Sequence, residues 1–282
     1  MISNPIPNSL RALVLGAWAG TLLLLERKRG LRHLRESKFV RDTRNLTVAA
    51  GAGVVMQLLE MPVALGLSRA AQRRRWGIAQ RLPLPPLLRA FGAILALDYT
   101  LYWWHFLTHR VPLLWRFHRV HHIDREMDAT TALRFHFGEI AISVIFRAGQ
   151  MIVVGPTPAI VAVWQVLLFL SILFHHSNVR VPLDWERSIA RLIMTPRLHG
   201  IHHSIEPAEV NSNWSSGLTV WDWLHRTLRT EVPQEHLVLG VAGMRSDADV
   251  QIGRLMTVPL TEPSNVPEYD GKPVRQSFDK LT

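Results

Sequence analysis

The longest apolar block of the chain covers residues 140–174 and contains one charged residue, Arg147. A Gly-Pro-Thr-Pro turn at 155–158 divides this block into two halves. Each half has roughly 17 residues, which is near the lower limit for a transmembrane helix. We therefore expect a helical hairpin that enters a bilayer and returns to the same side.

Three further apolar segments precede this hairpin, at residues 12–25, 46–67 and 87–107. The last two are weaker candidate spans, because they contain Glu60, Arg89 and Asp98. Long apolar blocks separated by Arg-rich loops are typical of membrane proteins. The expected fold is all-α, a multi-span membrane protein with a histidine-rich helical cap facing the surface.

The basic cluster Arg27-Lys28-Arg29 follows the first apolar segment. A signal peptide has its basic residues before the apolar run, so we expect a retained anchor with its C-terminal end in the cytoplasm. The expected domain organisation is N-terminal anchor helices and basic loops at 1–85, an enzyme domain at 86–230 and a polar tail at 231–282. From about residue 240, prolines among polar residues predict an irregular surface segment.

The net charge of +10 raises the question of nucleic acid binding. Lys and Arg concentrate at 27–44 and 69–81, beside apolar blocks, where they would lie against anionic lipid headgroups. No nucleic-acid-binding motif accompanies them, so no nucleic acid partner is expected. The chain has no cysteine, which excludes disulfides, thiolate metal sites and iron–sulfur clusters.

Eleven of the fourteen histidines lie between residues 105 and 203. The pattern H-x-x-H-H occurs at 118–122 and again at 199–203, and H-F-L-T-H occupies 105–109. Residues at i, i+3 and i+4 share one face of a helix. Such spacing is typical of helices that hold a metal ion, whereas the isolated His33, His225 and His236 are not expected to be ligands.

The histidine groups also lie where the apolar segments end. The five histidines of residues 105–122 lie at and just beyond the end of the third segment. His136 shortly precedes the hairpin, and His175 and His176 directly follow it. All groups can therefore meet at one membrane surface. Ten imidazoles exceed the ligands of one ion and would suit two, and nitrogen ligands fit iron, copper, nickel or zinc.

The same motifs give the chain a specific resemblance. It resembles the fatty acid hydroxylase/sterol desaturase superfamily of integral-membrane di-iron enzymes over about residues 90–228. The resemblance is carried by D-Y-T-L-Y-W-W-H-F-L-T-H (98–109), L-W-R-F-H-R-V-H-H (114–122), T-A-L-R-F-H-F-G-E (131–139), H-S-N (176–178), T-P-R-L-H-G-I-H-H-S (195–204) and N-W-S-S-G-L-T-V-W-D-W-L (213–224). Two departures are Trp214-Ser215, where the family often has Tyr-Gly, and Phe137, where a proline is frequent.

The resemblance implies the metal ligands residue by residue. Eight of them lie in the three repeated motifs and two, His136 and His176, complete the set, giving His105, His109, His118, His121, His122, His136, His176, His199, His202 and His203. His175 is the weaker member of its adjacent pair. Four polar residues in the matching motifs would either orient imidazoles or serve as caps and loop anchors: Asp98, Glu139, Asn178 and Asp222.

The activity implied is hydroxylation or desaturation of a membrane lipid (sterol, fatty acyl or related) with two iron ions and O2. Electrons would come from a separate ferredoxin-, cytochrome- or flavoprotein-type donor, because the chain has no dinucleotide fingerprint, haem module or cysteine. The alternatives are a non-enzymatic membrane metal or haem protein and a zinc-loaded lipid hydrolase. We expect the metal site on the cytoplasmic side, although this orientation leaves the basic residues 69–81 outside.

Overall fold

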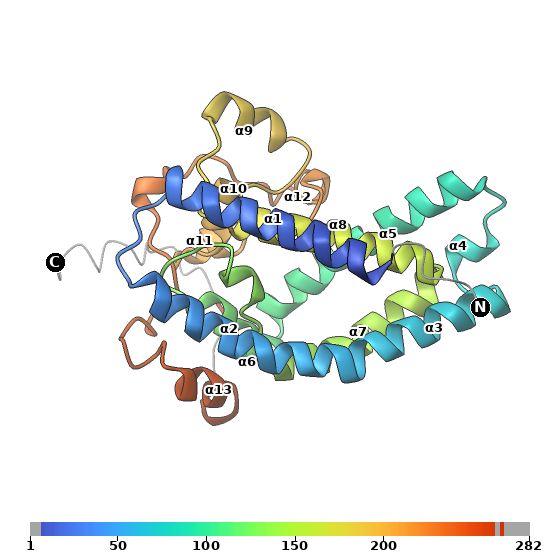
Figure 1. Cartoon of the computed structure of the whole chain (residues 1–282), viewed down its shortest axis with the longest axis horizontal. Helices are drawn as coiled ribbons and strands as arrows, with labels where there is room; N and C mark the ends of the chain where they lie inside the picture. Colours follow the sequence, from blue (N-terminus) through green and yellow to red (C-terminus); the bar gives the residue numbers. More distant parts are fainter. Residues whose placement is uncertain (1–6, 263–265, 268–282) are drawn as a thin grey trace.

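The computed structural model describes residues 7–262, 266 and 267 (Figure 1). Its long helices are α1 (Asn8–Lys28), α2 (Lys38–Val55), α3 (Met61–Arg74), α5 (Pro86–Arg110), α7 (Phe137–Val154) and α8 (Pro158–His176). They run along the long axis of the molecule, and β pairing within the described part is limited to isolated bridges. The all-α prediction is confirmed.

The predicted hairpin is formed by α7 and α8. Gly155 adopts a left-handed conformation with φ 67°, which ends α7. Thr157 then caps α8 by accepting a hydrogen bond from Ile160 N at 3.3 Å, and Pro158 occupies the first helical turn. A glycine after the helix end and a proline at the next helix start are favourable at these positions.

Among the residues that the structure describes, four helical segments are long and apolar enough to cross a membrane: Asn8–Lys28, Lys38–Arg81, Phe137–Val154 and Pro158–His176. The predicted segment 46–67 lies inside the second of these, a run of 44 residues that includes the π-helical turn η1 (Met56–Glu60), α3 and α4 (Ile78–Arg81). The predicted segment 87–107 folds as the 25-residue α5, which does not belong to this set.

Two of the charged residues within the predicted spans, Glu60 and Arg147, contact each other inside the bundle. Glu60, at the end of η1, accepts hydrogen bonds from Ser143 Oγ at 2.9 Å and from Arg147 Nε at 3.3 Å. Arg147 also donates to Gln150 Oε1 at 2.6 Å and lies 4.7 Å from the ring centre of Trp164. Paired charges of this kind face the bundle interior in membrane proteins.

The predicted histidine-rich cap lies at the end of the bundle where α1 and α8 finish and α2 and α7 begin (Figure 1). The shorter helices of this half are α6 (Pro112–His122), the 3-10 turn η2 (Thr131–Leu133), α9 (Leu183–Ile189), α10 (Pro196–His202), α11 (Pro207–Val210), α12 (Val220–His225), the 3-10 turn η3 (Gln234–His236) and α13 (Ile252–Thr261).

The C-terminal region is more ordered than predicted. Residues 252–261 form α13, although Pro259 lies inside it. Leu255 and Val258 are buried there with Val48, Val120 and Ile123. The prediction of an irregular segment from residue 240 is therefore wrong for this part, because apolar burial against α2 and α6 stabilises the helix. The rest of the predicted tail, 263–265 and 268–282, lies outside the described residues.

Candidate metal centre

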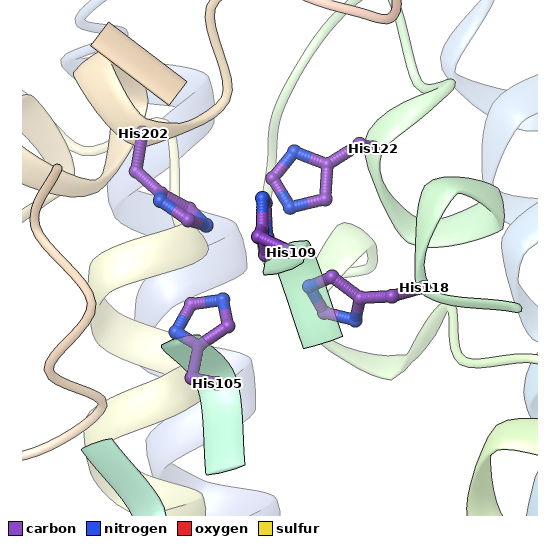
Figure 2. Close-up of side chains that lie close together, drawn as sticks. All are labelled: His105, His109, His118, His122 and His202. Carbon is purple, nitrogen blue, oxygen red and sulfur yellow. The ribbon is translucent and has the colours of Figure 1, made fainter. Parts of the chain in front are cut away.

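Two groups of buried histidines meet at the capped end of the bundle. In the first group, ring nitrogens of five imidazoles lie within 4.8 Å of one another: His105, His109, His118, His122 and His202. Figure 2 shows these rings turned toward a common space from α5, α6 and α10. In the second group, the same spacing joins His121, His176, His199 and His203. The structure thus brings together nine of the ten predicted ligands.

Each H-x-x-H-H motif is divided between the two groups. His118 and His122 of α6 belong to the first group, and His121 belongs to the second. At the end of α10 the division is reversed, since His202 joins the first group. The rings of His122 and His203 stack with centroids 4.3 Å apart across the boundary. The triplets therefore connect two neighbouring sites, where the spacing had indicated one shared helix face.

Hydrogen bonds fix the tautomer of three imidazoles in the first group. Nδ1 of His105 lies 2.7 Å from Trp214 O, Nδ1 of His202 lies 2.8 Å from Ser212 O, and Nδ1 of His118 lies 2.8 Å from Glu139 Oε1. Carbonyl and carboxylate oxygens only accept, so each Nδ1 carries the proton. The lone pair of each Nε2 is then free for a metal ion.

Several nitrogens of the first group have no hydrogen-bond partner among the residues that the structure describes. They are both ring nitrogens of His109 and His122, and Nε2 of His118 and His202. Buried polar atoms are normally satisfied, and unsatisfied ones need an explanation. A metal ion at the centre of the group would satisfy these lone pairs together, so the residues fit such an ion.

In the second group the Nε2 atoms converge still more closely. His176 Nε2 lies 2.9 Å from His121 Nε2 and 3.0 Å from His199 Nε2, and His203 Nε2 lies 3.2 Å from His199 Nε2. Nitrogens held at about 2.0–2.1 Å from one ion are about 2.9 Å apart at a right angle and about 3.3 Å at the tetrahedral angle. The observed distances match this range, so the second group also fits a metal ion.

Burial favours the uncharged form of five imidazoles in the cap. Burial lowers the pKa of His202 to about 3. Burial, followed by the neighbouring imidazoles, also lowers the pKa of His121, His122, His199 and His203 well below the usual value. Metal binding requires neutral imidazoles, so this environment prepares the side chains as ligands.

His136 and His175 stand outside both groups. His136 caps α7, where its Nδ1 accepts from Gly138 N at 2.9 Å. Its Nε2 lies 3.2 Å from Met256 O, so both ring nitrogens are occupied. His136 is therefore not among the nine imidazoles that the structure groups, and its role as a ligand stays a prediction. His175 is buried beside the second group, with its ring 4.1 Å from that of His199.

The four polar residues predicted to orient imidazoles take different positions. Glu139 contacts His118 directly. Asp222 acts indirectly, because it accepts hydrogen bonds from Trp214 N and Ser215 N, each at 2.8 Å. It thereby holds the backbone of Trp214, whose carbonyl oxygen contacts His105.

Asp98 and Asn178 form hydrogen bonds with groups other than imidazoles. Asp98 accepts from Trp221 Nε1 at 2.7 Å and from Leu218 N at 3.1 Å. Asn178 exchanges two hydrogen bonds with the backbone of Arg32, both at 2.9 Å. These residues anchor loops, which was the alternative reading of the sequence.

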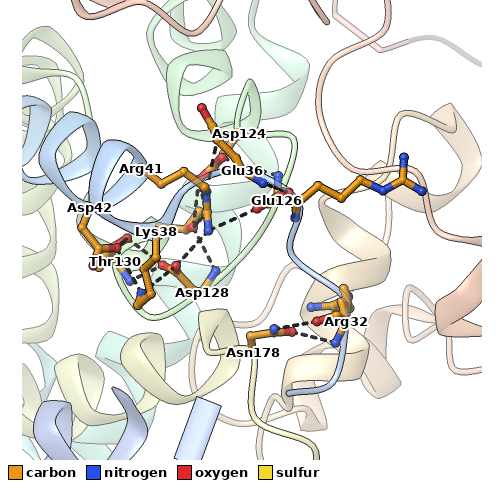
Figure 3. A network of polar contacts seen from close by, with 12 residues as sticks. Arg32, Glu36, Lys38, Arg41, Asp42, Asp124, Glu126, Asp128, Thr130 and Asn178 are labelled. Carbon is orange, nitrogen blue, oxygen red and sulfur yellow. Dashed lines mark hydrogen bonds and ion pairs between the residues drawn. The ribbon is translucent and has the colours of Figure 1, made fainter. Parts of the chain in front are cut away.

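A buried ionic network beside the histidines was not predicted (Figure 3). Arg41 of α2 contacts Asp124 at 2.9 Å and Asp128 at 2.8 Å, and all three side chains are fully buried. Asp124 follows His122 by two residues, so the network fixes the loop that leaves α6. In the sequence, the only sign of this network is that Asp124 and Asp128 follow a histidine triplet closely. Their partner Arg41 is distant in sequence, so the pairing itself could not be predicted.

Comparison with known proteins agrees with this site. Residues 90–227 match the family model described as fatty acid hydroxylase. Alkylglycerol monooxygenase of Xenopus tropicalis is 31% identical over 147 residues, which cover 51% of this chain and 31% of that protein. An ornithine lipid hydroxylase of Rhizobium tropici is 31% identical over 160 residues, which cover 55% of this chain and 46% of that protein.

Cholesterol 25-hydroxylase of Mus musculus is 29% identical over 147 residues, which cover 51% of this chain and 48% of that protein. The matched region thus spans less than half the length of these curated relatives. No solved structure matches the chain. The matched residues contain all nine grouped histidines. This chain thus matches the fatty acid hydroxylase family over residues 90–227.

Proposed function

We propose that this chain is a membrane-bound lipid hydroxylase that uses two iron ions, O2 and electrons from a separate donor. The observation that carries the proposal is the pair of adjacent, buried histidine groups with converging lone pairs. The matched relatives are named as a monooxygenase or hydroxylases, and the names refer to lipids. Hydroxylation is therefore the favoured reaction, and a membrane lipid is the favoured substrate.

Two iron ions would be held by the two groups, with His105, His109, His118, His122 and His202 around one and His121, His176, His199 and His203 around the other. When bound, such a centre supplies the oxygen activation that an unactivated C–H bond requires and that side chains cannot supply. The balanced reaction converts R–H, O2, two electrons and two protons to R–OH and H2O.

The protein's own contribution is positioning and exclusion of water. The carbonyls of Trp214 and Ser212 and the carboxylate of Glu139 keep Nε2 of their histidines aimed inward. Such outer contacts orient ligands and raise their basicity. Burial of all nine imidazoles keeps bulk water away from the centre. Glu139 places a carboxyl group beside the first group, whereas in the second group Nδ1 of His176 lies 2.8 Å from the carbonyl oxygen of Ile172.

We place the histidine end on the cytoplasmic side. The richer of the two basic clusters, residues 27–44, lies at this end, where Leu31 N donates to Asn178 O at 2.7 Å. Positive residues favour the cytoplasmic side of a span. In intact cells, a membrane-impermeant maleimide should label Arg74→Cys and leave Arg29→Cys unlabelled. The opposite labelling would reverse the orientation.

The decisive experiment uses the protein purified in mild detergent. Iron near two ions per chain, no Soret band, and O2 consumption only after reduction would agree with the proposal. With a lipid extract as substrate, a product sixteen mass units heavier that takes its oxygen from 18O2 would identify hydroxylation. One haem per chain, or zinc retained when iron is supplied during expression, would contradict the di-iron proposal in favour of a haem protein or a zinc hydrolase. A product two mass units lighter would identify desaturation instead.

A further inference from the structure

Two short helices of the cap carry large apolar side chains that face outward. We define the α9–α12 patch as Trp185, Leu192, Ile193, Val220, Trp223 and Leu224. Trp185 and Trp223 are each 72% exposed, and Leu192 is 69% exposed. Exposed apolar patches of this kind mark surfaces that contact a membrane or another protein.

The patch is one continuous surface because backbone contacts join its two halves. Thr219 N donates to Leu192 O at 3.1 Å, and Met194 N donates to Gly217 O at 3.0 Å. Between these bonds, Ile193 and Leu218 form an isolated bridge. The residues that follow α9 therefore lie directly beside the start of α12.

The inner faces of both helices are held by buried carboxylates. Glu186 of α9 is 3% exposed and binds Arg197 of α10 at 2.5 Å. Asp222 of α12 is fully buried and holds the backbone at Trp214 and Ser215. The outward orientation of Trp185 and Trp223 is therefore fixed by the fold.

The position of α12 is set by α5. Nε2 of His225 lies 3.1 Å from Tyr99 Oη, and its ring stacks on Tyr102 with centroids 5.0 Å apart. Tyr99 and Tyr102 precede His105 by one to two turns, which corresponds to roughly 5–9 Å along the helix. Hence α12 lies below the level of the histidines, alongside the bundle.

Figure 1 shows where α9 lies along the bundle. In Figure 1, α9 projects sideways from the bundle, level with the C-terminal half of α1 along the horizontal axis. That half of α1 belongs to a segment long and apolar enough to cross a membrane, and Leu24 and Leu25 on it are exposed. Thus α9 lies at the same level along the bundle as exposed apolar side chains of a candidate span.

The charges near the patch match a lipid surface. Arg187, Arg191 and Arg226 are exposed on α9, after it and at the end of α12. The acidic neighbour Asp184 is paired with Arg187 at 3.4 Å. Tryptophan and leucine with flanking arginines are typical of helices that lie in the interface of an anionic bilayer.

From these observations we propose that the α9–α12 patch is a bilayer-contacting surface, which buries Trp185 and Trp223 among lipids and places the adjacent arginines at anionic headgroups. The cap would then sit partly in the membrane rather than above it. The proposal requires no metal ion, so its test is separate from that of the di-iron site.

The chain has no cysteine, so each single Cys variant carries one thiol for a fluorescent label. Full-length Trp185→Cys and Trp223→Cys, labelled with NBD, would be reconstituted in vesicles of equal parts phosphatidylcholine and phosphatidylglycerol. Asp247→Cys provides a water-exposed control, because that side chain is 92% exposed and lies outside the patch. Leu13→Cys on α1, 68% exposed on a candidate span, provides a lipid-exposed control.

We expect the labels at 185 and 223 to emit at shorter wavelength than the label at 247. We also expect them to be quenched by nitroxide-labelled lipid, as at residue 13, and shielded from aqueous iodide. Iodide quenching equal to that at 247 would overturn the proposal. Shielding from both quenchers, with disulfide crosslinks between two copies of Trp223→Cys, would overturn it in favour of a protein interface. Leu192→Cys and Leu224→Cys give the same readout if a tryptophan variant fails to fold.

Discussion

Nδ1 of His118 donates a hydrogen bond of 2.8 Å to Oε1 of Glu139, and both side chains are buried. In this contact a carboxylate touches a grouped imidazole directly. It sets the proton on Nδ1 and leaves Nε2 of His118 directed into the first group. Glu139 is therefore the residue whose removal should disturb metal binding without removing a ligand.

We expect Glu139→Ala to weaken metal binding by about 10–100-fold, the range for loss of a carboxylate that supports a ligating histidine. Glu139→Gln, which retains an acceptor but loses the charge, should lie between this variant and the wild type. The measurement is competition with a chelator, followed by metal analysis. Glu60→Gln is the matched control, because Glu60 is a buried acid that contacts Ser143 and Arg147. An equal loss in the control would assign the effect to general destabilisation.

His136 caps α7, whereas His122 lies in the first group of imidazoles, so the two positions should respond differently to substitution. Asparagine is a favourable N-cap, so His136→Asn can still cap α7 and should retain the full metal content. His122→Asn removes an imidazole whose two nitrogens have no hydrogen-bond partner among residues 7–262, 266 and 267, and should lower the metal content of the first group. Metal per chain, measured by mass spectrometry on monodisperse protein, decides the question. A comparable loss in both variants would make His136 a ligand.

The histidine positions show which features of the site could be predicted from the sequence. The spacing of His118, His121 and His122 indicated a metal site, and the Gly-Pro-Thr-Pro turn indicated that the hairpin returns to the same surface. Both conclusions depend on local geometry. The division of each triplet between two groups depends on how α6 and α10 are rotated against α5 and α8, which long-range packing determines.

Long-range partners also explain why some positions could not be inferred from the sequence. Nε2 of His136 is occupied by a carbonyl of α13, 120 residues away. Asp124 and Asp128 are paired with Arg41, more than 80 residues away. No local pattern identifies such partners. The charge of Glu60 weakened a predicted span for the same reason, since its partner Arg147 lies on another helix.

The pairing of Arg41 with Asp124 and Asp128 predicts a large effect on stability. Arg41→Ala leaves two fully buried carboxylates without their main partner. Breaking a buried ion pair costs about 3–5 kcal/mol, so the detergent-solubilised protein should unfold at a clearly lower temperature. Thermal unfolding of the metal-free protein measures this directly. The exposed Arg187→Ala serves as control and should change the stability by less than about 0.5 kcal/mol. Equal midpoints for both variants would rule out a stabilising role.

The same network should respond to acid. Burial alone raises the pKa of Asp124, but Arg41 and Arg134 lower it overall, and Arg41 and Lys38 likewise lower the pKa of Asp128. Because the folded-state pKa values lie below the unfolded value of about 3.9, this stabilisation is complete above that pH and is lost as the pH falls further. In Arg41→Met, burial without the arginine should raise both pKa values.

We therefore expect the acid limb of the stability curve of Arg41→Met to begin at higher pH than that of the wild type. Melting temperature against pH, measured on both metal-free proteins, gives the comparison. Titration of the histidines affects both proteins alike and cancels in the difference. Superimposable acid limbs would show that Arg41 does not control the two carboxylates.

Within the bundle, Glu60 and Arg147 should be coupled in the same sense. Arg147→Met leaves Glu60 buried at 6% exposure without its cation, which should destabilise the packing of α3 and η1 against α7 by about 3–5 kcal/mol. Glu60→Gln removes the charge that would be left unpaired, so the double variant should recover much of this loss. Unfolding in mixed detergent micelles, analysed as a double-mutant cycle, measures the coupling. Additive losses would mean that each residue acts through other contacts, Glu60 through Ser143 and Arg147 through Gln150 and Trp164.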